Sequence, residues 1–209
     1  MLRATTDLRH EGGISVVLLA DGQCISEMSY AWVPGRLLGI ERDVVPFITR
    51  NQSARHDTAA VIRFREHFPQ NSPSYFCLAA MRGIAEANGK PHIAGIKHDC
   101  QIAFAEQYAS SFRSSYCEFW KSFGGVEQGR QAYLMPVPLV VPPLSSVKAK
   151  HRGRALERRR HWSEISASAA ATTARYGRGD RPRAASAGAQ LLHHVMPHLS
   201  TLMSLALVV

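Results

Sequence analysis

A histidine between two charged residues is the strongest candidate for chemistry in this sequence. Lys97, His98 and Asp99 follow a short apolar run at 93–96. An imidazole can accept a proton near neutral pH, so His98 could act as a general base that Asp99 orients. Adjacent side chains of an extended chain point to opposite sides, so this cooperation requires a turn. The alternative is structural, with Lys97 and Asp99 forming an ion pair or capping the next helix.

Thiol and metal chemistry have weaker support. Cys100 lies close to His98, but the sequence offers no third group that would complete a nucleophilic constellation. The four cysteines include no C-x-x-C pair, and the ten histidines show no repeated Cys/His spacing. We therefore predict reduced cysteines and no metal site.

The elements that would position His98 are well marked. Ser72 is expected to cap a helix over 74–88, and Gly89 is expected to end it in the left-handed conformation. The strand expected at 92–96 is apolar on both faces, as a strand covered by helices would be. Polar residues that follow such a strand lie where parallel sheets bind ligands.

The remaining pattern predicts an α/β domain. Two β-rich runs at 13–20 and 24–33 flank Asp21-Gly22 and indicate an antiparallel hairpin. Aromatic residues three or four positions apart indicate a helix over 111–123 that ends at two glycines. Further strands are expected at 44–49 and 132–141, and further helices at 59–68 and 145–170. The proline in the first of these strands predicts an edge strand, an irregularity or a shorter element.

The positive charge is concentrated in one segment. The chain of 209 residues has a formal net charge of +9, and residues 148–183 carry eleven Lys and Arg against three Asp and Glu. A basic segment is a weaker indication of nucleic-acid binding than a basic domain, and no base-reading motif accompanies it. No apolar signal segment follows the N-terminus, so we expect a cytoplasmic protein.

The helix expected at 145–170 has three interpretations. Its cations could bind phosphates of nucleic acid, lie on anionic lipid headgroups, or form the solvated face of a helix packed on the sheet. Leu156, Trp162 and Ile165 lie near one face, which is compatible with a membrane surface. The residues predicted to contact a membrane or another anion are Lys148, Lys150, Arg152, Arg154, Arg158, Arg159 and Arg160.

The end of the chain differs in composition. Residues 175–183 are basic and turn-rich, and the apolar end from residue 191 contains three histidines and no charged side chain. We expect residues 1–171 to form the folded domain and residues 172–209 a disordered tail. A membrane-spanning tail is the alternative, and it is disfavoured by its length and histidines.

Five blocks of sequence occur in a fixed order. They are NSPSYFCLA at 71–79, AGIKHD at 94–99, YCEFWK at 116–121, RQAY at 130–133 and KHR at 150–152. Together they resemble the VirK/YbjX family of Gram-negative bacteria. The resemblance implies a protein of the cytoplasm, or one peripheral to the inner membrane, whose partners are anionic membrane or envelope proteins. It also implies roles in virulence, in the expression or placement of surface proteins, and in resistance to antimicrobial peptides.

Two departures from that family concern the ends of the chain. Family members usually have a further N-terminal region, so the resemblance implies a domain that is incomplete there. Residues after about 171 do not resemble the family's ending, and a shifted reading frame or an altered terminus would explain their composition.

The order of elements also resembles the GNAT acyltransferase fold. In that fold a glycine-containing turn opens a helix and holds the coenzyme A pyrophosphate on backbone N–H groups, and a strand and an aromatic helix follow. The resemblance places a modified acyl-CoA site at Gln70, Ser72 and Ser74, with His98 and Asp99 at the acceptor side.

Three residues depart from the GNAT pattern. Pro73 and Tyr75 stand where small residues are expected, and proline removes a donor. Where those enzymes commonly place a general-acid tyrosine, four residues before a glycine, this sequence has Trp120. An indole does not deliver a proton at working pH. We therefore expect a GNAT-like mixed sheet flanked by helices, and favour a non-enzymatic adaptor at the envelope without a cofactor. The alternative is a GNAT-like acyltransferase that binds acyl-CoA, and the oligomeric state is left open.

Overall fold

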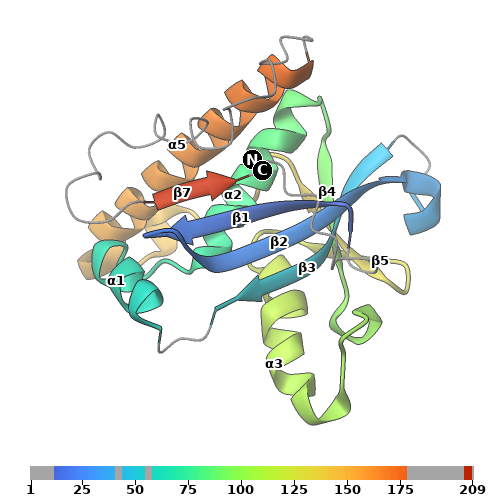
Figure 1. Cartoon of the computed structure of the whole chain (residues 1–209), viewed down its shortest axis with the longest axis horizontal. Coiled ribbons are helices and arrows are strands. Elements are labelled where there is room, and N and C mark those ends of the chain that lie inside the picture. The colour runs from blue at the N-terminus through green and yellow to red at the C-terminus, as the bar shows by residue number, and fades with distance from the viewer. Residues whose placement is uncertain (1–11, 41–43, 55–57, 178–204, 209) are drawn as a thin grey trace.

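One mixed sheet organises the chain. The computed structural model describes residues 12–40, 44–54, 58–177 and 205–208. Within them the chain forms a sheet of seven strands in the order β5-β6-β4-β3-β2-β1-β7 (Figure 1). The strands are β1 (Ile14–Ala20), β2 (Gln23–Pro34), β3 (Val44–Ser53), β4 (His92–Ile96), β5 (Val126–Gln128), β6 (Ala132–Pro136) and β7 (Leu205–Val208).

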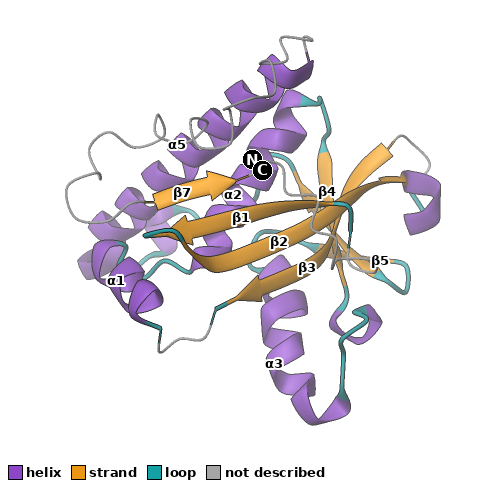
Figure 2. Cartoon of the chain, viewed as in Figure 1, coloured by secondary structure: helices purple, strands orange, loops and turns teal. Residues whose placement is uncertain are grey.

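Helices of very different length connect these strands (Figure 2). The α-helices are α1 (Ala59–His67), α2 (Pro73–Ala87), α3 (Ala109–Arg113), α4 (Phe119–Lys121) and α5 (Arg152–Gly177). A π-helical turn, η4 (Ser114–Glu118), joins α3 to α4. The 3₁₀ segments are η1 (Gly35–Leu38), η2 (His98–Cys100), η3 (Glu106–Tyr108), η5 (Leu144–Ser146) and η6 (Ala149–His151). The predicted α/β fold, a mixed sheet with helices that include a basic C-terminal helix, is confirmed.

The predicted hairpin forms at Asp21-Gly22. Both residues have positive φ, 50° and 75°, as the commonest two-residue hairpin turn requires. β1 and β2 pair antiparallel from Ile14↔Tyr30 to Ala20↔Gln23, and β3 adds to β2 in the same sense. The first three strands are therefore an antiparallel meander.

β3 changes the direction of the sheet. It pairs antiparallel with β2 but parallel with β4, and the parallel pairing consists of Phe47↔Ala94 and Ile48↔Gly95. The proline expected to weaken this strand, Pro46, lies where β3 pairs with β2 alone. β3 is therefore longer than the strand expected at 44–49, and it lies in the interior of the sheet. Its proline is tolerated because it lies outside the residues that pair with β4.

Helix α2 follows its sequence signals. Ser72 is the N-cap by position, but its side chain makes no cap hydrogen bond. Pro73 is the first helical residue, and Gly89 after the helix has φ 62°. The Lys90 N–H donates to the carbonyl of Ala85, which closes the C-terminal end. The N-terminus of α2 lies beside the end of β3, because Ser74 in its first turn shares a hydrogen bond with Ser53.

The helices that pack on the sheet bury their side chains against one face. Ile93 of β4 belongs to the main core with α1, α2 and α5, whereas its neighbour Ala94 belongs to a small cluster with Leu38, Val45 and Ala132. The prediction that helices cover β4 on both faces is therefore wrong in part. A 3₁₀ segment, η1, supplies the cover on the second face, and the small side chain of Ala94 suits that thin layer.

The basic helix begins and ends later than expected. α5 runs from Arg152 to Gly177, past the predicted end of the domain at residue 171. Residues 178–204 of the predicted tail lie outside the described residues, so the predicted disorder there is not tested. β7 pairs antiparallel with β1 from Val17↔Val208 to Ala20↔Leu205. This pairing covers the outer edge of β1.

The contact between α2 and α5 depends on a glycine. A Cβ atom at Gly83 would overlap the carbonyl oxygen of Ser166, whereas a Cβ atom at Gly153 would meet nothing within 4 Å. Gly83→Ala is therefore expected to lower the free energy of unfolding by about 1–3 kcal/mol, because α5 must move away. Gly153→Ala is expected to leave it unchanged or raise it by up to about 1 kcal/mol. Urea unfolding of both variants checks this, and stabilisation by both would contradict the close packing.

Candidate functional site

A cleft opens where β3 ends beside α2. Its volume is about 580 Å³, and we call it the β3–α2 cleft. It is lined by residues 50–54, by Ser72, Ser74 and Tyr75, and by Gln101, Ala103, Ser111, Phe112, Ser114, Ser115, Tyr116, Glu118, Phe119 and Ser122. Seven of these residues are serines, so hydroxyl groups and aromatic rings dominate the wall. Such a wall suits a ligand that carries both polar and apolar groups.

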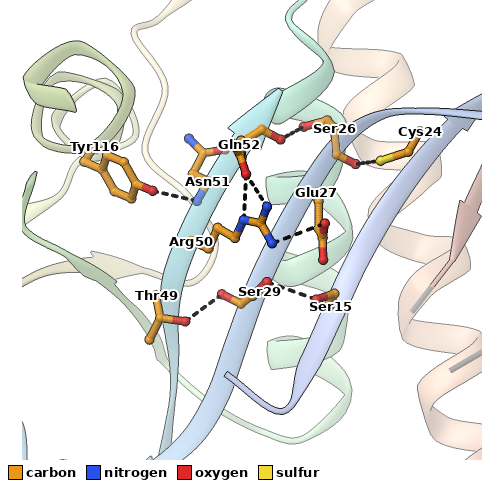
Figure 3. A network of polar contacts seen from close by, with 10 residues as sticks. All are labelled: Ser15, Cys24, Ser26, Glu27, Ser29, Thr49, Arg50, Asn51, Gln52 and Tyr116. Carbon is orange, nitrogen blue, oxygen red and sulfur yellow. Dashed lines mark hydrogen bonds and ion pairs between the residues drawn. The ribbon is translucent and has the colours of Figure 1, made fainter. Parts of the chain in front are cut away.

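The floor of the cleft is the part of β3 that lies beyond its pairing with β4. One extra residue, Thr49, interrupts the register between Ser29↔Arg50 and Tyr30↔Ile48, and bulges of this kind re-aim the side chains that follow. Beyond it, the Asn51 N–H donates to the Tyr116 hydroxyl at 3.3 Å instead of to a neighbouring strand (Figure 3). The aromatic segment thus supplies a hydrogen bond that the sheet no longer provides.

Asn51 keeps one polar atom available in this floor. Its Nδ2 donates to the Ser115 carbonyl at 2.8 Å, which fixes the orientation of the amide. Its Oδ1 is buried and has no hydrogen-bond donor among the described residues, although the residue is 7% exposed. Buried polar atoms are normally paired, so a ligand N–H or O–H is the natural partner for this oxygen.

The charged side chain of the floor is held in place. Arg50 donates to Gln52 Oε1 through Nε at 2.8 Å, and its guanidinium lies 3.5 Å from Glu27 Oε2 (Figure 3). Ser53 and Ser74 share a hydrogen bond of 2.9 Å, which joins the end of β3 to the first turn of α2. The floor and the helix N-terminus are therefore one polar surface.

Two of the three residues predicted to bind a cofactor line this cleft. Ser72 and Ser74 do so, at the N-terminus of a 15-residue helix. Gln70 is not among the lining residues, and its carbonyl accepts from Arg158 Nη1 at 3.3 Å. Tyr75 closes the inner wall, because its ring packs against Phe119.

Helix α5 holds the loop that precedes α2. Trp162 Nε1 donates to Asn71 Oδ1 at 3.0 Å, and the Arg158 guanidinium lies 5.4 Å from the Trp162 ring. Arg159 donates to the Pro142 carbonyl, and Arg152 donates to the Val147 carbonyl at 3.0 Å. Three of the predicted anion-binding residues therefore make contacts within the fold.

The other four predicted basic residues are exposed. They are Lys148, Lys150, Arg154 and Arg160, and the last lies 3.8 Å from Glu164. Leu156 is 58% exposed between them. An apolar side chain among cations is typical of a helix that can lie on a membrane surface.

His98 and Asp99 are not among the residues that line the cleft. Both belong to the short turn η2, which follows β4 as the sequence predicts. The His98 Nδ1 atom is 3.1 Å from Cys117 Sγ and 3.9 Å from Asp99 Oδ1. The imidazole and the Phe104 ring pack edge to face, with their centroids 5.6 Å apart. The thiol beside the imidazole is thus Cys117, and Cys100, which sequence reasoning considered, donates to the Arg130 carbonyl.

A second polar chain continues from Cys117. Tyr133 donates to Glu127 Oε1 at 2.7 Å, and Lys97 Nζ donates to Glu127 Oε2 at 3.1 Å. Burial, the bond to Glu127 and the nearby Cys117 raise the pKa of Tyr133. The bonds from Tyr133 and Lys97 lower the pKa of Glu127. Lys97 therefore pairs with Glu127, whereas the sequence suggested Asp99.

Comparison with known proteins identifies the domain. Residues 72–171 match a family described as a protein of unknown function, DUF535, which is the VirK/YbjX family. The matched segment is a VirK/YbjX domain. No curated protein and no solved structure is significantly similar to the chain.

The VirK/YbjX segment supplies most of the candidate site. It begins at the N-cap of α2 and reaches into α5, so it contains Ser74, His98, Cys117 and Trp162. The floor at residues 50–54 lies outside it. Among the described residues, no group of three or more His, Cys, Asp or Glu side chains is arranged to hold a metal ion. None of the described helices combines the length and apolar character needed to cross a bilayer.

The Tyr116 hydroxyl is expected to stabilise the floor of the β3–α2 cleft. Tyr116→Phe removes the acceptor for the buried Asn51 N–H, and an unsatisfied buried donor costs about 1–3 kcal/mol. We expect that loss in the free energy of unfolding, together with faster hydrogen exchange at the Asn51 amide. Tyr108→Phe is the control, because Tyr108 is 57% exposed. Equal stability and exchange in both variants would contradict this role.

Proposed function

We propose that this VirK/YbjX domain binds a coenzyme A thioester in the β3–α2 cleft. The observation that carries the proposal is the unpaired, buried Asn51 Oδ1 in a floor that continues into the N-terminus of α2. The pantetheine part of coenzyme A is a chain of amide and hydroxyl groups. An amide N–H of that chain would satisfy the Asn51 oxygen, and the phosphates would lie at the helix N-terminus.

The size and chemistry of the cleft agree with such a ligand. A volume of about 580 Å³ lies within the range of small-molecule sites. Serine hydroxyls along the wall can bond the polar chain, and Phe112, Tyr116 and Phe119 can cover an acyl group. The GNAT-like order of elements supports the same placement, because the turn before α2 is where that resemblance expects the acyl donor.

Binding has more support than acyl transfer by the usual general acid. Trp120, at the position of that acid, is buried and donates to the Ile96 carbonyl at 2.8 Å. Its indole is a structural group, and Pro73 withholds one backbone donor from the first turn. The proposed function is therefore recognition of the thioester, with an adaptor role at the envelope as its consequence.

Two tryptophan substitutions on one helical segment test this proposal. Ser114 lines the cleft and Ser110 does not, and both are exposed. Ser114→Trp is expected to weaken acetyl-coenzyme A binding about tenfold or more, equal to about 1.4 kcal/mol, because the indole occupies the cleft. Ser110→Trp is expected to bind like the unaltered protein. Isothermal titration calorimetry measures both, with coenzyme A and adenosine triphosphate as comparison ligands.

The titration of the unaltered protein is the first test. Folded protein that releases no heat with acetyl-coenzyme A or with a longer acyl-coenzyme A would overturn the proposal. Equal losses for Ser114→Trp and Ser110→Trp would place any binding outside the cleft and would overturn it as well.

The exposed part of the basic helix favours a second candidate function. Lys148, Lys150, Arg154, Arg160 and the apolar Leu156 are all exposed, which supports contact with an anionic membrane. Such contact agrees with what the family resemblance implies, a protein peripheral to the inner membrane. The implied roles are in the expression or placement of surface proteins and in resistance to antimicrobial peptides. It leaves Arg152, Arg158 and Arg159 to their contacts within the fold.

Flotation with vesicles that contain phosphatidylserine tests the membrane surface. The variant Lys150→Gln/Arg154→Gln is expected to bind about thirtyfold more weakly, at about 1 kcal/mol for each basic residue. Arg36→Gln/Arg130→Gln removes two exposed charges elsewhere and is expected to bind normally. Absence of binding at low salt, or the same weakening in both variants, would rule this surface out.

A further inference from the structure

The contact between Cys117 and His98 defines a reactive site that the proposed function does not use. We propose that Cys117 is a nucleophile that takes an acyl group from a thioester, with His98 as its base. The Cys117 Sγ atom and the His98 Nδ1 atom are 3.1 Å apart, within reach for proton transfer. This inference rests on the proposed function only for the delivery of the thioester.

The reaction balances with these two side chains. His98 accepts the Cys117 S–H proton on Nδ1, and the thiolate attacks the carbonyl carbon of the thioester. The bond from that carbon to the sulfur of coenzyme A then breaks. The departing thiolate takes the proton from His98, so the products are S-acyl-Cys117 and free coenzyme A. No oxidant or metal is needed.

Polar groups surround the Cys117–His98 pair. Asp99 Oδ1 lies 3.9 Å from the same His98 nitrogen that faces the thiol. The Tyr133 hydroxyl lies next to the sulfur and is held by Glu127, which also binds Lys97. A cation and a hydroxyl near a thiol increase its reactivity.

The position of Cys117 links the pair to the cleft. Its chain neighbours Tyr116 and Glu118 both line the cleft, as does Gln101, three residues after His98. All three belong to the segments that carry the pair, so the pair lies directly behind the cleft wall. Cys117 also lies in the π-helical turn η4, and such turns frequently occur at functional sites.

The other three cysteines provide internal controls. Cys77 is buried without an imidazole partner, and burial raises its pKa to about 12. Cys24 and Cys100 are exposed, and burial of part of each side chain raises their pKa values. If exposure alone decided the rate of modification, Cys24 and Cys100 would therefore react fastest, and Cys117 would react as slowly as Cys77.

Alkylation of the folded protein tests this ranking. We expect iodoacetamide to modify Cys117 about tenfold or more faster than Cys77, and faster than the exposed Cys100, because the thiolate is the reactive form. Peptide mass spectrometry gives the rate at each cysteine. His98→Gln is expected to lower the Cys117 rate to that of Cys77 while the thermal midpoint changes little. A ranking that follows exposure would overturn the proposal.

Acylation distinguishes this inference from the proposed function. Acetyl-coenzyme A and the small thioester S-phenyl thioacetate are each expected to leave an acetyl group on Cys117, and neither on Cys77. Acetylation by the small thioester alone would support the nucleophile and count against coenzyme A delivery through the cleft. If calorimetry shows binding of acetyl-coenzyme A but neither reagent leaves an acetyl group on Cys117, the proposal that Cys117 is a nucleophile is overturned. The proposal that the cleft binds the thioester would then still stand.

Discussion

The packing of Trp120 on Gly95 is the contact on which the candidate site depends. A Cβ atom at residue 95 would lie 2.6 Å from the indole ring, so the ring rests directly on the strand backbone. Its Nε1 donates to the Ile96 carbonyl at 2.8 Å. This contact fixes the aromatic segment over β4 at the residue where β3 stops pairing with it. Tyr116, one turn earlier, thereby reaches the Asn51 N–H in the separated part of β3.

The long basic helix contributes to the site through structure more than through charge. α5 packs closely on α2 at Gly83, and its Trp162 and Arg158 bond the loop that leads to Ser72. Arg158, predicted from the sequence to contact an anion, therefore holds the loop that precedes α2. The exposed cations Lys148 and Lys150 precede the helix, and the exposed Arg154 and Arg160 lie on it. One helix thus carries two separate surfaces.

The VirK/YbjX segment and the strand meander meet at this site. The matched residues supply the helix N-terminus, the aromatic wall and the thiol–imidazole pair, and β3 supplies the floor. A polar cleft beside a buried thiol is a compact arrangement for holding a thioester and removing its acyl group. The ion pair of the exposed Glu127 with Lys97 supports that arrangement from the side of β5 and β4, where Tyr133 connects it to the sulfur.

The sequence by itself determined the elements that local chemistry specifies. Asp21-Gly22 fixes a hairpin because both residues tolerate positive φ, and Ser72, Pro73 and Gly89 fix the ends of α2. It also identified the domain family and placed His98 after a buried strand. Tertiary structure decided which side chains meet. Cys117 and not Cys100 lies beside His98, and Lys97 pairs with Glu127 and not with Asp99. Such partners are distant in sequence, and no local propensity encodes the sheet register and helix packing that bring them together. The same reason explains why the sequence did not indicate that Asn51, beyond the strand expected at 44–49, forms part of the floor of a cleft.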